Sequence, residues 1–273
     1  MTSSPDDEVL LALALEVAYE AGRLLVEERP DVVSADVKSS PTDMVTEMDR
    51  ASEALLVERI AAARPHDGIL GEEGGERRGT SGVRWILDPV DGTTNYLYGL
   101  PAWAVSVGVE RAGVVVAGVV EAPALGRRYL AVRGGGAWEE DGRARRSLRV
   151  STCESLALAL ISTGFGYSAK RRAEQAEDLR HLAPRVRDIR RMGSAALDLA
   201  WVGAGYVDGY FETGLHPWDV AAGSLIVEEA GGRFYAVPGS PEAGDLTIAV
   251  SPGIAEELVT ALTASGLNSI EST

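Results

Sequence analysis

The spacing of apolar residues predicts two helices in the first part of the chain. Apolar residues recur every three or four positions over residues 6–28, which predicts an amphipathic helix that ends before Pro30. A second helix is predicted through residues 46–64 and ends before Pro65. The segment between them, residues 37–45, is expected to be extended or to form a hairpin.

Strands dominate the next part of the chain. Residues 68–75, "GILGEEGG", are expected to form a short strand that runs into an acidic loop, and residues 83–90, "VRWILDPV", a second strand that ends in carboxylates. Two further β-rich runs meet at Ala112-Gly113, which is a hairpin signal. Residues 127–146 add another strand and turn.

Strands and helices alternate after about residue 146, which is typical of an α/β arrangement. Helices are expected to begin near Ala169, Ser194, Trp218 and Gly253. We therefore predict an α+β first half, residues 1–145, that carries most of the functional acids, and an α/β second half, residues 146–273. The two halves are expected to be subdomains that share one active site.

Composition and charge exclude several classes of protein. The chain has 273 residues, of which 45% are hydrophobic and 25% charged, as in ordinary globular proteins. Its formal net charge of −15 disfavours binding to nucleic acid or to an anionic membrane surface. The single cysteine, Cys153, cannot form an intrachain disulfide. With no basic leader and no apolar run of membrane-spanning length, a cytoplasmic location is expected.

Two glycine-rich runs offer alternative interpretations. Gly164, Gly166 and Ala169 have the G-x-G-x-x-A spacing of a dinucleotide-binding turn, and Asp188 follows at about the right distance. About 150 residues of acid-rich chain come before this run, however, so close packing in a turn is the preferred interpretation. Residues 134–136 are also interpreted as a turn, because no GK[ST] follows them.

Carboxylates recur at the predicted strand ends and helix starts. They are Asp43, Asp49, Glu72, Glu73, Asp88, Asp91 and Asp219. Two unpaired carboxylates about 4 Å apart repel each other by roughly 1 kcal/mol in water and by more inside a protein. Hard oxygen ligands without a Cys or His cluster favour Mg²⁺, Mn²⁺ or Ca²⁺ over zinc or iron. The acids therefore predict a divalent metal site.

The residues after Asp91 are suited to binding a phosphate group. Gly92 allows close approach of the backbone, and free N–H groups at a helix start attract anions. Residues 193–195, Gly-Ser-Ala, open a helix in the same way. An ordinary serine cap is an equally good interpretation of that second run.

Several segments together resemble one family. They are "GEEGG", "WILDPVDGTTNYLYGLPAWAVSVGV", "HPWDVAAGSLIVEEAGG", "KSSPTDMVTEMD" and "RRMGSAALDLAWVGAGYVDGYFETGLHPWD". In this order they resemble the inositol monophosphatases, the Mg²⁺-dependent, lithium-sensitive phosphatases related to fructose-1,6-bisphosphatase. The resemblance covers most of the chain. It implies a layered αβαβα sandwich, commonly as a homodimer.

The resemblance also assigns roles to individual residues. The implied ligands of two or three Mg²⁺ ions are Glu72, Asp88, the backbone carbonyl of Val90, Asp91 and Asp219. The implied catalytic residues, which orient the attacking water, are Glu72, Thr93 and Asp49. Phosphate is expected on the amides of Gly92 and Thr93, and the polyol beside Gly193, Ser194, Ala195, Glu212 and Asp219.

Two positions are assigned less directly. Lys38 matches a basic position near the active-site loop of the family. Pro217, before "WD", stands where some relatives carry another residue, and it is expected to alter the wall of the polyol pocket without affecting Asp219.

The predicted activity is Mg²⁺-dependent hydrolysis of inositol 1-phosphate by direct attack of water, in a lithium-sensitive cytoplasmic homodimer that binds neither nucleic acid nor membrane. Alternatives within the same fold are phosphatases for fructose-1,6-bisphosphate, histidinol phosphate or an adenosine 3′-phosphate. Outside this class, a dinucleotide-dependent oxidoreductase would need to bind its cofactor at Gly164 and Gly166. A noncatalytic regulator with the same fold is disfavoured because the acids and Thr93 are all present.

Overall fold

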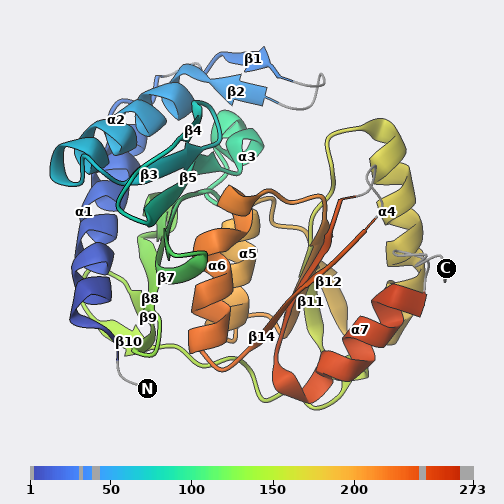
Figure 1. The fold of residues 1–273 in the computed structure, drawn as a ribbon. Coiled ribbons are helices and arrows are strands. Elements are labelled where there is room, and N and C mark those ends of the chain that lie inside the picture. Colours follow the sequence, from blue (N-terminus) through green and yellow to red (C-terminus); the bar gives the residue numbers. More distant parts are fainter. Residues whose placement is uncertain (1–2, 31–32, 39–43, 240–243, 265–273) are drawn as a thin grey trace, which may run out of the picture.

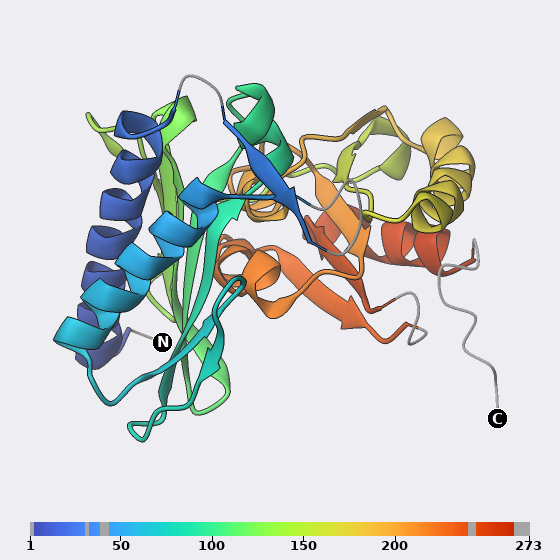
Figure 2. The same ribbon diagram turned by 90° about the horizontal axis from the view of Figure 1, so that it is seen from above.

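Layers of helices and sheets alternate through the structure, a computed structural model that describes residues 3–30, 33–38, 44–239 and 244–264. Their order is helices, sheet, helices, sheet, helices, as seen from left to right in Figure 1 and from above in Figure 2. This is the αβαβα sandwich that the family resemblance implies. None of the described helices is long and apolar enough to cross a membrane.

The first layer consists of α1 (Pro5–Glu27) and α2 (Glu47–Ala63), close to the predicted bounds. The apolar stripe of α1, which includes Leu10, Val17 and Leu25, is buried against the first sheet. At the start of α2, Thr46 and Asp49 form a capping box, in which each side chain accepts a backbone N–H of the other residue. The short strands β1 (Ala35–Val37) and β2 (Met44–Thr46) lie between the two helices in sequence and form an antiparallel pair. Asp43 lies outside the described residues.

The first sheet has the strand order β10-β9-β8-β7-β6-β5-β3-β4. Its strands are β3 (Gly68–Gly71), β4 (Gly75–Arg77), β5 (Val83–Asp91), β6 (Ala104–Arg111), β7 (Val114–Ala122), β8 (Arg127–Val132), β9 (Gly136–Glu140) and β10 (Arg145–Ser147). Neighbouring strands are antiparallel except for β3 and β5. The short helix α3 (Thr93–Tyr98) follows β5 directly. The predicted hairpin at Ala112-Gly113 is confirmed, and both residues have positive φ.

The second sheet has the strand order β12-β11-β13-β15-β14. Its strands are β11 (Leu160–Thr163), β12 (Asp188–Arg190), β13 (Gly209–Thr213), β14 (Arg233–Val237) and β15 (Leu246–Val250). The predicted alternation of elements is confirmed, but the sheet is mixed, because β15 runs antiparallel to β13 and β14. The described residues between β14 and β15 contain no helix, and a parallel pair would need a crossover of that kind.

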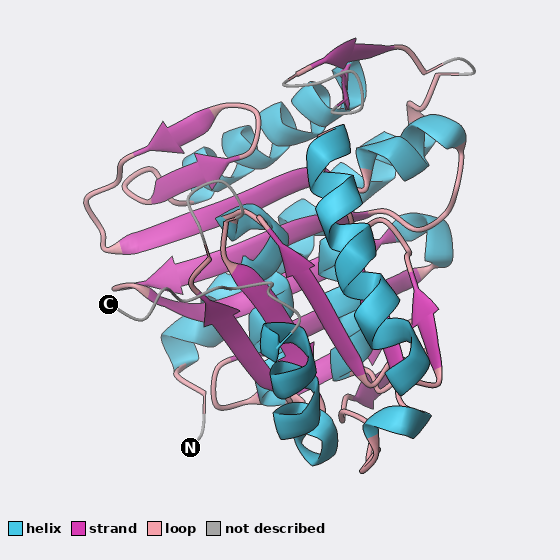
Figure 3. Cartoon of the chain, turned by 90° about the vertical axis from the view of Figure 1, so that its right-hand side faces the viewer, coloured by secondary structure: helices cyan, strands magenta, loops and turns pink. Residues whose placement is uncertain are grey.

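Helices cover the second sheet on both faces. On the outer face lie α4 (Ala169–Leu182) and α7 (Ala255–Ala264), which are in front of the sheet in Figure 3. Between the two sheets lie α5 (Ala195–Gly203) and α6 (Pro217–Glu229). Short 3₁₀ helices complete the described elements: η1 (Pro123–Leu125), η2 (Leu156–Leu158), η3 (Ala183–Arg185) and η4 (Pro252–Ile254). The predicted division into two subdomains after residue 145 stays a prediction. Both α5 and α6 belong to the second half of the sequence, but they pack on both sheets.

A pair of glycines sets how closely α6 approaches the first sheet. Gly108 on β6 lies directly opposite Gly118 on β7. A Cβ atom at Gly118 would come within 2.9 Å of the Cα atom of Ala222, and one at Gly108 within 2.6 Å of the Cβ atom of Ala221. Both alanines follow Asp219 in the first turns of α6, so the glycines fix the height of that turn above the sheet.

The glycine-rich turn at residues 134–136 is occupied by a carboxylate of the chain itself. Glu229, the last residue of α6, accepts hydrogen bonds from the amides of Gly134 (2.8 Å) and Gly136 (3.0 Å). Arg133 also pairs with Glu228 at 3.0 Å. The turn interpretation of this run is confirmed, and the turn fastens the C-terminal end of α6 to the first sheet.

The close approach of α6 gives a prediction about stability. We expect Gly118→Ala to lower the free energy of unfolding by roughly 1–3 kcal/mol, the usual cost of overpacking a tight contact. Thermal unfolding of the variant, beside Val114→Ala on the exposed part of the same strand, measures the effect. A Tm equal to that of the wild type would show that α6 does not depend on this glycine pair.

Candidate active site

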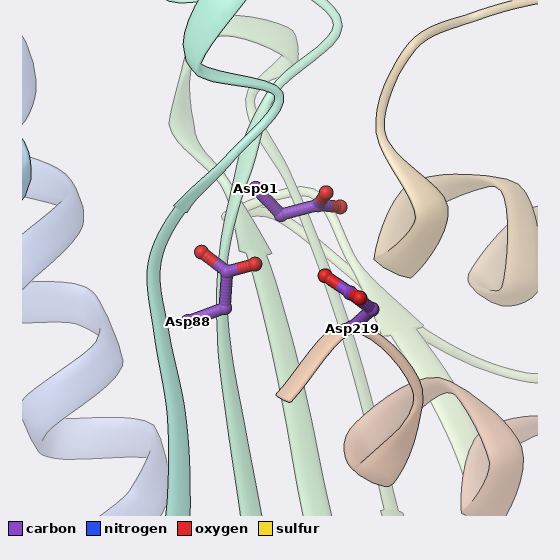
Figure 4. A group of neighbouring side chains, drawn as sticks. All are labelled: Asp88, Asp91 and Asp219. Atoms are coloured by element: carbon purple, nitrogen blue, oxygen red, sulfur yellow. The ribbon is translucent and has the colours of Figure 1, made fainter. Parts of the chain in front are cut away.

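Three aspartates converge on one point between the first sheet and α6. Asp88 and Asp91 come from the end of β5 and Asp219 from the first turn of α6, and one carboxylate oxygen of each lies within 4.8 Å of the others (Figure 4). Residues three apart on a regular strand point to opposite faces of the sheet. An irregularity in the pairing between Asp88 and Asp91 bends β5 and brings both carboxylates to the same place.

The electrostatics of this group favour a bound cation. Burial raises the pKa of Asp88 well above its usual range, and repulsion from Glu72, Asp91 and Asp219 adds to the effect. Asp88 is 2% exposed, and within the described residues its carboxylate accepts one hydrogen bond, from the Val90 amide at 3.0 Å. Such a poorly compensated set of carboxylates fits a divalent metal ion, because the ion offsets their repulsion and takes oxygen ligands.

Asp91 is held by the start of α5. It accepts hydrogen bonds from the hydroxyl of Ser194 (2.5 Å) and from the amides of Ala195 (3.2 Å) and Ala196 (2.7 Å). Burial raises the pKa of Asp91 to about 6, although these hydrogen bonds lower it. Ser194 also caps α5 by accepting the Leu197 amide, as the cap interpretation predicts. The anion at this helix start is therefore a carboxylate of the chain.

This arrangement bears on the residues assigned to the polyol side. The Ser194 hydroxyl and the Ala195 amide contact Asp91 in the structure, and their contact with a substrate stays a prediction. Gly193, with φ of 91°, lies one residue earlier, and its carbonyl oxygen is 3.0 Å from where a Cβ atom of Gly92 would stand. The turn at Gly92, proposed to bind phosphate, and the turn at Gly193, proposed to line the polyol, thus lie side by side.

Glu72 lies on the loop after β3, together with a lysine from β1's end. The Lys38 ammonium donates to Glu72 at 2.8 Å and also to Glu73. Burial disfavours the Lys38 charge, but these hydrogen bonds outweigh burial and raise its pKa. Burial likewise raises the pKa of Glu72, which Lys38 opposes. Lys38 therefore offsets part of the negative charge of the loop that carries a predicted ligand.

Thr93, the first residue of α3, contacts a buried aspartate. Its hydroxyl lies 3.0 Å from a carboxylate oxygen of Asp49 and 3.1 Å from the Val90 carbonyl. The second oxygen of Asp49 accepts from the amide (2.9 Å) and the hydroxyl of Thr46. Gly92, with φ of 94°, caps α3 and leaves the first amides of that helix without a side-chain cap. The catalytic and phosphate-binding roles of these residues stay predictions.

Glu212 on β13 lies partly buried beside the glycine-rich run of residues 164–166. It accepts a hydrogen bond from the Tyr210 hydroxyl at 2.6 Å. Burial raises the pKa of Glu212 to about 7, although this hydrogen bond opposes the effect. A Cβ atom at Gly164 would lie 1.8 Å from the Glu212 carboxylate, so only glycine fits there.

The G-x-G-x-x-A run is thus explained by internal packing. Gly164 makes room for Glu212, and the Gly166 amide donates to Gln175 at 2.8 Å. Asp188, which would bind a ribose in a dinucleotide site, pairs instead with Arg190 at 2.7 Å. These contacts favour the turn interpretation over a dinucleotide site.

Other residues around the site were missed by sequence reasoning. Glu53 on α2 binds the loop that carries Glu72, and Ser52 donates to the Pro89 carbonyl at 3.0 Å. Asn95 donates to the carbonyls of Ala102 and Met192 and so joins the two turns. One signal was available for Glu53, since it follows Asp49 by four residues and shares its face of the helix. Pro217 begins α6, where proline is favoured.

Comparison with known proteins decides the family. Residues 6–268 match the model of the inositol monophosphatase family. The chain belongs to the inositol monophosphatase family. Members of this family are metal-dependent phosphatases, and the group formed by Asp88, Asp91 and Asp219 is consistent with that property.

Individual relatives agree with this membership. The inositol-1-monophosphatase SuhB of Mycobacterium tuberculosis is 45% identical over 94% of this chain and 95% of the relative. The Nus factor SuhB of Escherichia coli is 44% identical over 82% of this chain and 83% of the relative. The solved structure of Mycobacterium tuberculosis SuhB superposes with a TM-score of 0.84, covering 96% of this chain and 99% of that one.

The raised pKa of Asp91 predicts how pH and Mg²⁺ act together on stability. Without metal, Asp91 holds its proton in the folded chain but loses it in the unfolded chain between its usual pKa of 3.8 and about 6, so its contribution to stability falls as pH rises through this range. Mg²⁺ binds the deprotonated carboxylates. The rise in Tm caused by a fixed Mg²⁺ concentration, relative to chelator, should therefore be larger at pH 7.5 than at pH 5. Equal shifts at both pH values would contradict the assignment of Asp91 as a ligand.

Proposed function

We propose that this chain is a Mg²⁺-dependent phosphomonoesterase that hydrolyses inositol 1-phosphate to inositol and phosphate. The observation that carries the proposal is the convergence of Asp88, Asp91 and Asp219 next to the pair formed by Thr93 and Asp49. Membership of the family supports the reaction class, and the name of the mycobacterial relative supports the substrate.

The residues proposed to hold the metal are Glu72, Asp88, the carbonyl of Val90, Asp91 and Asp219. A bound divalent ion would supply Lewis-acid polarisation of the phosphate and a lowered pKa of water. The protein's part is to fix the ligands, which the hydrogen bonds of α5 do for Asp91 and the His216 amide does for Asp219 at 2.6 Å.

The remaining roles follow from the hydrogen bonds around Thr93. The hydroxyl of Thr93 is oriented by Asp49, which is fully buried and held at its other oxygen by Thr46. In the proposed reaction this hydroxyl and Glu72 orient the water that attacks phosphorus directly, in line with the leaving oxygen. The amides at the start of α3 bind the phosphate oxygens. No covalent intermediate with the protein is involved.

The proposal extends to the choice of substrate. Glu212 is proposed to accept hydrogen bonds from hydroxyl groups of the polyol, and Gly193, Ser194, Ala195 and Asp219 are proposed to line the same side of the substrate. Fructose-1,6-bisphosphate, histidinol phosphate and adenosine 3′-phosphate are the alternative substrates. A homodimer, a cytoplasmic location and inhibition by lithium complete the proposal, on the strength of the family resemblance.

A panel of phosphomonoesters tests the activity. Phosphate release should require Mg²⁺, stop in excess chelator, and be fastest with inositol 1-phosphate. Full turnover in chelator would end the proposal. Since one relative is named a Nus factor, the absence of release from every ester would instead favour a noncatalytic role.

Asp91→Asn tests the metal ligand. The amide is nearly the same size but lacks the charge, so we expect kcat/KM to fall by two orders of magnitude or more, roughly 3 kcal/mol. The far-UV circular dichroism spectrum should be unchanged. Asp188→Asn, at an exposed aspartate paired with Arg190, is the matched control and should keep full activity. Comparable activity in both variants would mean that Asp91 only shapes the turn.

Glu212→Ala tests polyol recognition. Loss of charge-assisted hydrogen bonds worth about 1.5–3 kcal/mol should lower kcat/KM on inositol 1-phosphate by roughly ten to a hundred fold. An aryl phosphate without hydroxyl groups should be hydrolysed almost as before, because the metal ligands and Thr93 are unchanged. Equal losses on both substrates would show that Glu212 supports the fold or the metal site instead.

A further inference from the structure

Glu53 is a buried carboxylate that has no part in the mechanism above. It lies on α2, is 6% exposed and follows Asp49 by four residues. Residues four apart on a helix lie on the same face, about 6 Å apart along the axis. Asp49 reaches Thr93 from this face, and Glu53 reaches the loop between β3 and β4.

Both carboxylate oxygens of Glu53 accept backbone hydrogen bonds from that loop. One oxygen accepts from the amide of Glu73 at 2.8 Å, and the other from the amide of Gly74 at 2.5 Å. These amides directly follow Glu72. A charged acceptor with a separate donor for each oxygen fixes both the position and the orientation of the loop backbone.

The glycines of the loop are matched to this contact. A Cβ atom at Gly71 would lie 2.5 Å from one oxygen of Glu53, and a Cβ atom at Gly74 would lie 2.6 Å from the other. Gly71 precedes Glu72 and Gly74 follows Glu73, so the two acidic residues are flanked by positions that admit the Glu53 carboxylate. Neither glycine has a positive φ, so the space for Glu53 is the constraint there.

A space lies beside the loop on the side that faces α2. A cavity of about 400 Å³ lies between α2 and the β3–β4 hairpin, and its lining includes Glu53, Val57, Gly71, Glu73 and Gly74. The amides of Glu73 and Gly74 donate to Glu53 at the edge of this space, so these two hydrogen bonds join the loop to α2 there.

We propose that Glu53 is a positioning residue, which sets the place of Glu72 relative to Thr93 through the backbone of residues 73 and 74. Helix α2 then acts as a rigid spacer, with Asp49 orienting Thr93 and Glu53 orienting the loop of Glu72. The role of Glu72 as a metal ligand rests on the proposed function. The geometry of the loop does not.

Glu53→Gln tests this role with the size of the side chain unchanged. The glutamine side chain keeps one oxygen that can accept a loop amide. Its NH₂ group faces the other backbone N–H, and two donors cannot bond to each other, so one loop hydrogen bond is lost. Hydrogen exchange of a peptide covering residues 70–77 should become at least about tenfold faster in the metal-free protein. Mg²⁺ binding, measured by calorimetry, should weaken by about tenfold. Glu58→Gln, at an exposed position on the same helix, is the matched control and should change neither.

A second variant reaches the same contact from the loop. Gly74→Ala places a methyl group against the Glu53 carboxylate at an exposed position, and we expect the same two changes. It replaces Glu53→Gln in the test should that variant not fold.

The outcomes separate this role from the proposed function. Unchanged loop exchange in both variants would overturn the positioning role, whatever the wild type hydrolyses. Faster exchange with unchanged Mg²⁺ binding would also overturn it, since Glu72 would not depend on the loop position. A wild type that binds Mg²⁺ and shows the expected pattern, yet releases no phosphate from any monoester, would instead overturn the proposed function.

Discussion

Repulsion among carboxylates brought together out of water is the constraint on which the rest of the structure depends. Asp88, Asp91 and Asp219 come from two elements that are 128 residues apart at their nearest members, 91 and 219, and nothing in their own charges draws them together. The fold must hold them against a cost that grows as the dielectric falls. The irregularity in β5, the start of α5 and the glycine pair beneath α6 each fix one of the three.

The helices between the sheets, α5 and α6, hold the aspartates in place because they contact both sheets. One side of α6 packs into the core of the first sheet through Leu225 and Ile226, and Val227 packs toward the second. Helix α5 likewise contacts both cores, and the amides in its first turn donate hydrogen bonds to Asp91. The proposed metal ligands Asp88, Asp91 and Asp219 thus lie where the two halves meet, and they come from both halves.

Periodicity and turn chemistry were enough to predict most of the helices and strands, because these elements carry clear apolar patterns, while the order of the layers came from the family resemblance. The antiparallel direction of β15 could not be read from the alternation of elements. The pairing of Asp91 with Ser194, and the fit of Gly164 to Glu212, join residues 103 and 48 positions apart, and no local pattern encodes them. The family resemblance supplied the proposed ligands. It did not reveal Glu53, whose contact is with backbone amides that any sequence would offer.

The fastening of α6 at both ends has a consequence for how the chain comes apart. Its N-terminal part packs against the glycine pair of β6 and β7. Its last residue, Glu229, accepts hydrogen bonds from the turn at residues 134–136. A helix from the C-terminal half is therefore part of the core of the N-terminal sheet. Separating the halves would expose that core and strip the second sheet of its inner cover, so the two sheets should unfold in one cooperative transition rather than as independent domains.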